Sequence, residues 1–144
     1  MRDSLSIVAM AINLLYNRRF KCETKTVMPV LIISEKATTE QMQEMLLSLE
    51  SYIKLAVDIE LGILSGGGKL HADCESELLE NGSKQENVWG ADWLPFAEDV
   101  TFESLINVRP RQNNFSMIIT DPELRSKIET VARKLLEGVE YERS

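Results

Sequence analysis

Five ionisable side chains near the middle of this 144-residue chain are of types that could do chemistry as a group. Carboxylates combined with one imidazole suit Mg²⁺ or Mn²⁺ better than structural Zn²⁺. The same groups serve as general acids and bases. The group consists of Asp58, Glu60, His71, Asp73 and Glu75, of which His71, Asp73 and Glu75 are the candidate metal ligands.

The residues on either side of a triple glycine predict two strands that would position this group. Apolar residues alternate over residues 55–63 and again over residues 70–78. Period two is the strand signature, because successive side chains point to opposite faces. Glycine tolerates positive φ, so we expect Gly66, Gly67 and Gly68 to form the turn of a hairpin. All five ionisable side chains would then lie on one face of that hairpin.

Three interpretations of this acidic face are open. It is a solvated sheet face with its acids balanced by arginine or lysine, a metal or acid–base site, or a charged surface for a partner. Like charges directly opposite one another destabilise a strand pair by roughly 0.2–1 kcal/mol. Each interpretation therefore needs a group, or the solvent, that offsets the repulsion.

A second group of candidate residues, for ligand binding, consists of Trp89, Asn107 and Arg109. Alternation predicts a strand over residues 101–109, and a place beside the hairpin would bring Arg109 to the acidic face. Arg109 would there form an ion pair with a carboxylate, or alternatively bind a phosphate or carboxylate ligand. We expect Trp89 in the core, with stacking on a ligand as the alternative.

The remaining segments predict an α+β fold: a mostly antiparallel sheet of about five strands with two helices on one face. A capping box formed by Thr38 and Gln41 begins one helix. The run Thr120-Asp121-Pro122-Glu123, a capping residue with proline in the first turn and Glu at N3, begins the other helix, and Gly138 ends it. The further predicted elements are strands over residues 29–34 and 88–94 and helices over residues 39–52 and 121–137.

The first 27 residues differ from the rest of the chain. Residues 5–15 are mostly apolar but too few to span a bilayer, which needs about 20. They are also a poor signal peptide, because Asp3 precedes them, the positive charges follow them and no small-residue cleavage site appears. They are either a short amphipathic helix packed on the domain or an extension ahead of a functional start at Met28. We divide the chain into this extension (1–27), one α+β domain (28–138) and a C-terminal tail (139–144).

Charge and cysteine content restrict the function classes. A net charge of −7 argues against general nucleic-acid binding and against docking on anionic membranes. Cys22 and Cys74 form no disulfide framework or metal spacing, so a reduced, cytoplasmic setting fits best. Cys74 is expected as a small buried hydrophobe, and no nucleophile with a base beside it is recognisable.

Four motifs resemble those of an uncharacterised family of small bacterial proteins, a domain of unknown function. They are VDIE (57–60), LHADCESELLENGSKQ (70–85), WG (89–90) and SLINVRP (104–110). The resemblance covers roughly residues 30–136, and the loop at residues 113–116 departs from the family's Gly-Asn-Arg-Ser run. Because the family carries no established activity, the resemblance implies a fold more than a mechanism.

Two functional hypotheses follow. The first is a small cytoplasmic α+β protein that acts by binding, as a homo-oligomer or as a regulatory partner of another protein. The alternative is a metal-dependent hydrolase or phosphoesterase, in which the acidic face holds Mg²⁺ or Mn²⁺ and Arg109 holds an anion.

Overall fold

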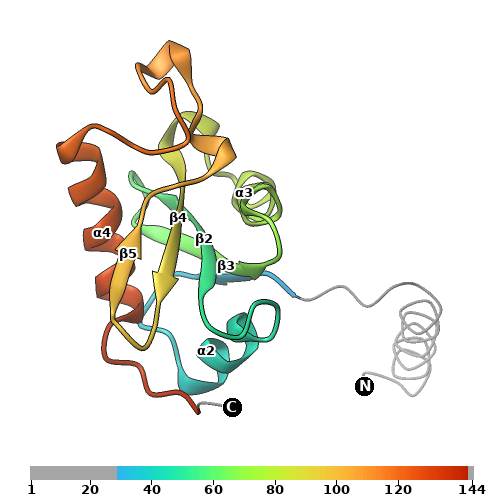
Figure 1. Ribbon diagram of the computed structural model, residues 1–144. Helices are drawn as coiled ribbons and strands as arrows, with labels where there is room; N and C mark the ends of the chain where they lie inside the picture. The colour runs from blue at the N-terminus through green and yellow to red at the C-terminus, as the bar shows by residue number, and fades with distance from the viewer. Residues whose placement is uncertain (1–28, 143–144) are drawn as a thin grey trace, which may run out of the picture.

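A five-stranded antiparallel sheet forms the centre of the domain in the computed structural model, which describes residues 29–142 (Figure 1). The strand order is β1-β3-β2-β4-β5, so the β2–β3 hairpin lies in the middle of the sheet. The α+β class and the mostly antiparallel sheet are therefore confirmed. The strands are β1 (Leu31–Ile33), β2 (Ile53–Asp58), β3 (Ile63–Gly68), β4 (Val88–Leu94) and β5 (Asp99–Thr101).

Three α-helices cover the two faces of the sheet: α2 (Thr39–Leu46), α3 (His71–Glu80) and α4 (Pro122–Leu136). Helices α2 and α4 share one face and its larger hydrophobic core, as the prediction of two helices on one face requires. Helix α3 lies on the other face, over a smaller core, and was not predicted. No helix within residues 29–142 has the length and apolar character of a membrane span.

The predicted hairpin is wrong in its turn and in its second arm. The turn occupies residues 59–62, and Val57 pairs with Leu64 across it. The triple glycine lies inside β3, and residues 71–80 form α3. The predicted strand over residues 70–78 therefore does not exist.

The sequence of α3 also carries a helical pattern. His71, Cys74 and Leu78 are buried at spacings i, i+3 and i+7, which is one face of a helix. No β-branched or aromatic residue occurs from Lys69 to Gly82, and such residues are the ones enriched in strands. Helix propensity and burial of this face therefore outweigh the apparent alternation.

The triple glycine serves close packing instead of a turn. A Cβ on Gly66 would lie 2.9 Å from Met45 Sδ of α2, and a Cβ on Gly68 would lie 3.3 Å from Cys74 Sγ of α3. Side chains at these positions would push the two helices away from the sheet. The glycines thus allow α2 and α3 to approach opposite faces of β3.

Two further predicted elements are shorter than expected. Helix α2 ends at Leu46 and not near Tyr52, because a turn with Glu50 at a φ of 65° leads into β2. The strand predicted over residues 101–109 ends at Thr101. Short 3-10 helices follow it: η2 (Leu105–Asn107) and η3 (Pro110–Gln112), with η1 (Gln85–Asn87) ahead of β4.

Candidate interaction site

The five ionisable residues predicted to share one face are dispersed. Asp58 ends β2, Glu60 lies in the exposed turn, and the other three lie on α3. Successive helical residues turn by about 100°, so His71, Asp73 and Glu75 cannot all point one way. Among residues 29–142, no three His, Cys, Asp or Glu side chains gather where they could hold one metal ion. The described residues therefore provide no ligand set for the predicted Mg²⁺ or Mn²⁺ site.

Asp58 is fully buried and shapes the β2–β3 turn. Its Oδ1 accepts hydrogen bonds from the backbone N–H groups of Glu60 and Leu61, both at 2.9 Å. Asp side chains at turns commonly accept hydrogen bonds from the backbone N–H groups that follow them. Its other oxygen, Oδ2, is buried without a protein partner.

His71 joins the start of α3 to β4. Its Nε2 lies 2.8 Å from Asp92 Oδ1 and 3.1 Å from the Ala91 carbonyl oxygen. A carbonyl oxygen can only accept, so Nε2 carries the proton. Thr101 Oγ1 donates to the second oxygen of Asp92 at 3.3 Å. His71 was predicted as a candidate site residue, but Asp92 was not, because no motif or spacing in the sequence marks it.

Glu75 meets Arg109, so α3 is tied to the segment that follows β5. Glu75 Oε2 lies 3.2 Å from Arg109 Nη2, and the two side chains are only 13% and 10% exposed. This is the ion pair that the sequence offered as one of two roles for Arg109. Trp89 is buried, as expected, and its ring lies 4.4 Å from the guanidinium carbon of Arg109.

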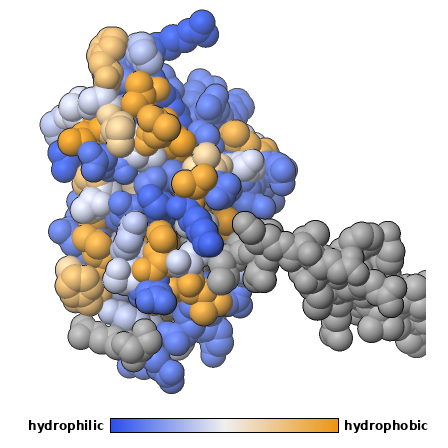
Figure 2. Space-filling view, turned by 45° about the vertical axis from the view of Figure 1, so that its right-hand side comes forward, coloured by the Kyte–Doolittle hydropathy of each residue, from blue (hydrophilic) through white to orange (hydrophobic). Residues whose placement is uncertain are grey.

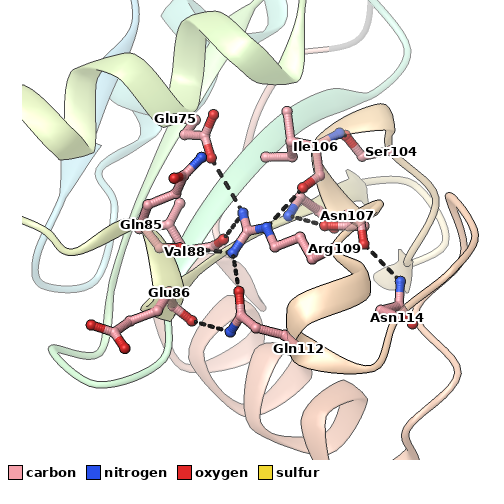
Figure 3. Close-up of polar contacts among 11 residues, drawn as sticks. Glu75, Gln85, Glu86, Val88, Ser104, Ile106, Asn107, Arg109, Gln112 and Asn114 are labelled. Atoms are coloured by element: carbon pink, nitrogen blue, oxygen red, sulfur yellow. Dashed lines mark hydrogen bonds and ion pairs between the residues drawn. The ribbon is translucent and has the colours of Figure 1, made fainter.

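All five N–H groups of the Arg109 guanidinium have protein partners (Figure 3). Nε donates to the Ile106 carbonyl oxygen at 3.0 Å. Nη1 donates to the Gln85 carbonyl oxygen and to Gln112 Oε1, and Nη2 donates to Glu75 and to the Val88 carbonyl oxygen. Burial lowers the pKa of Arg109, and Glu75 opposes that shift. With its donors occupied, Arg109 holds the protein together and has none free for an anion.

Asn107, the third predicted binding residue, is fully buried and completes the edge of β4. Its Oδ1 accepts from Gly90 N–H at 2.8 Å, and its Nδ2 donates to the Gly90 carbonyl oxygen at 2.9 Å. Strand β5 pairs only with residues 92–94, so this side chain takes the place of a neighbouring strand. A Cβ on Gly90 would lie 2.6 Å from Ser104 Cβ, so only glycine permits this approach.

Asn114 fixes the return of the chain. Arg109 and Asn114 form a two-bond antiparallel bridge, with N–O distances of 2.7 and 3.1 Å. The buried Asn114 side chain donates to the carbonyl oxygens of Asn107, Ser116 and Ile118 at 2.8–3.2 Å. We call residues 104–120, closed in this way, the interaction loop.

The interaction loop presents apolar side chains to solvent. Leu105 and Phe115 are 74% and 73% exposed. Figure 2 shows hydrophobic residues gathered at the end of the molecule where Figure 1 places this loop. A groove of about 670 Å³ runs beside it, and its lining includes Leu105, Val108 and Pro110 of the loop and Glu86 of η1. The remaining exposed apolar side chains of the loop are Val108, Met117 and Ile118.

The charge of the interaction loop differs from that of the rest of the chain. The whole chain carries −7, yet residues 104–120 contain Arg109, Arg111 and no Asp or Glu. Arg111 is exposed and lines the groove. The loop is therefore an apolar and weakly basic surface on an acidic protein.

These features define a small α+β domain with a fixed, apolar loop surface. The chain belongs to the family described as "Protein of unknown function (DUF5674)", which matches residues 31–135. This confirms the resemblance to a domain of unknown function, and the matched range is close to the predicted residues 30–136. No curated protein and no solved structure matches the chain.

Proposed function

We propose that this protein is a self-associating interaction module that binds a second copy of itself through the interaction loop. The observation that carries the proposal is the exposure of five large apolar side chains on one short segment. Contiguous exposed apolar surface on a soluble protein marks interaction sites, since its burial is favourable. Burying Leu105 or Phe115 would contribute about 1.5–3 kcal/mol each.

The anchoring of the loop supports binding. The buried amides of Asn107 and Asn114 and the Arg109 guanidinium together bond to the backbone of β4, of the segment before β4 and of the loop itself. A surface held in one conformation loses little conformational entropy when a partner binds. Asn107 and Arg109, which the sequence offered as ligand-binding candidates, thus hold an apolar surface in place.

A second copy suits this surface for two reasons. The loop carries both an exposed aromatic side chain, Phe115, and an apolar groove beside Leu105. A two-fold interface needs such self-complementary parts, because each copy presents the same patch. The absence of carboxylates also reduces repulsion between two chains that each carry −7.

Sedimentation velocity over a concentration series tests this proposal. We expect the wild-type protein to form a dimer, and Leu105→Glu and Phe115→Glu to be monomers with unchanged circular dichroism. Leu70→Glu is the matched control, because Leu70 is also exposed but lies at the start of α3. A wild-type monomer at high concentration, or dimers that survive both loop substitutions, would overturn the proposal.

A further inference from the structure

A second apolar groove lies at the end of the molecule opposite the interaction loop, between α2, the turn after β4 and the C-terminal segment (Figure 1). Its volume is about 560 Å³. Leu47 and Phe96 line it and are 57% and 64% exposed, and Leu46 and Tyr141 complete its apolar part. Exposed apolar surface of this kind marks an interaction site, because its burial is favourable.

The charged residues that line this groove are all acidic. Glu50 and Glu142 line it. An adjoining hollow of about 450 Å³ shares Phe96 and Tyr141 with the groove and adds Glu98 and Glu140. Among the described residues, no lysine or arginine lines either one. The occupant that fits is an apolar segment with basic residues beside it.

This chain contains such a segment outside the described residues. Residues 5–15 are mostly apolar, with leucine, isoleucine, valine and methionine side chains, and Arg18, Arg19 and Lys21 follow them. One of the two interpretations of this segment from the sequence was packing on the domain. The apolar side chains and the carboxylates of the groove are the groups that this segment would contact.

The described chain begins close to Met45, which directly precedes two residues that line the groove. The Pro29 carbonyl oxygen and Met45 Cα both lie 3.1 Å from the position that a Cβ on Gly67 would take. Met45 directly precedes Leu46 and Leu47 in the sequence. The residues between 15 and 29 can span at most roughly 50 Å when extended, so residues 5–15 can reach the groove. A tethered segment also binds at a high effective concentration.

We propose that residues 5–15 bind in this groove, with Arg18 and Arg19 beside Glu50 and Glu142. The groove and the interaction loop lie at opposite ends of the molecule, so this inference does not depend on the proposed self-association (Figure 1).

Paramagnetic relaxation enhancement on the full-length chain tests the inference. A spin label on Cys22 reports where the segment lies, because Cys74 is buried with a pKa raised to about 11 and stays unlabelled. We expect the amide signals of Leu47, Glu50 and Phe96 to broaden. The signals of the interaction loop should stay sharp.

Matched variants make the result specific. Leu47→Glu should abolish the broadening, whereas Leu61→Glu, at a similarly exposed leucine in the β2–β3 turn, should leave it unchanged. Broadening spread over the whole surface, or insensitive to Leu47→Glu, would overturn the inference. A mixing experiment shows whether the contact is within one molecule. Isotope-labelled chains that carry no spin label are mixed with spin-labelled chains that carry no isotope. Broadening that persists in this mixture would also overturn the inference, because the contact would then be between molecules.

Discussion

Removing the Arg109 side chain should destabilise this protein more than any substitution of an exposed charge. Arg109→Met leaves a hydrophobic chain of similar length but removes five hydrogen-bond donors. The Glu75 carboxylate and the carbonyl oxygens of Val88 and Ile106 then lose this partner, whereas the Gln85 carbonyl oxygen keeps the Val88 N–H. Buried acceptors without donors are costly, because they have left water and gained nothing in its place.

The size of the expected destabilisation follows from the burial of the Arg109–Glu75 ion pair. Breaking a buried ion pair by removing one partner costs about 3–5 kcal/mol. Both side chains keep a little exposure, 10% for Arg109 and 13% for Glu75, which favours the low end of that range. We therefore expect Arg109→Met to lower the free energy of unfolding by about 3 kcal/mol. Glu75→Gln should cost only about 1 kcal/mol, since Arg109 keeps its carbonyl partners.

Urea unfolding followed by circular dichroism measures both values, and the double variant gives the coupling between them. Arg109→Lys separates charge from geometry, because lysine keeps the charge but lacks the planar fork of donors. We expect it to recover less than half of the loss. If Arg109→Met costs under about 1 kcal/mol, the value of an exposed ion pair, the assignment of Arg109 as a buried anchor is refuted.

Three further outcomes can be checked on the same protein. Gly90→Ala should cost about 1–3 kcal/mol in urea unfolding through its contact with Ser104, and a second change, Ser104→Gly, should recover part of it; equal stability of Gly90→Ala and wild type would contradict the packing. In a Cys22→Ser background, Cys74 should resist a thiol reagent at mildly alkaline pH and react only in urea, since burial raises its pKa to about 11; rapid reaction of the folded protein would show that Cys74 is accessible. A ligand that binds the folded state raises the melting temperature. Millimolar Mn²⁺ should leave it unchanged, because the described residues offer no set of metal ligands. An increase that Asp73→Asn abolishes would revive the metal-site hypothesis.

The helix starts could be predicted because their signals are local. The capping box between Thr38 and Gln41 forms as expected, with bonds of 3.0 and 3.1 Å. Asp121 accepts from Glu123 N–H at the start of α4, next to Pro122. Each of these contacts joins residues only a few positions apart, so the sequence alone contains both partners.

The segment of α3 shows where local pattern is insufficient. Short stretches with apolar residues at i, i+2 and i+4 also contain the i, i+4 spacing of a helix. Cys74 and Leu78 satisfy both patterns, and their contact with Ala56 and Val88 on the sheet decides for the helix. The predicted acidic face required residues 70–78 to be a strand, so it does not form when residues 71–80 are a helix.

The sequence by itself determined the fold class and the approximate positions of β1, β2, β4, α2 and α4, and it offered an ion pair with a carboxylate as one of two roles for Arg109. Only the tertiary structure decided which carboxylate it is, and that all of its other donors are occupied. The partners of Arg109 come from α3, from the segment before β4 and from the loop itself. No local rule relates these distant segments, because their approach depends on how the sheet and helices pack. The same packing places Glu75, Asn107 and Arg109, three of the candidate site residues, beneath an exposed apolar loop.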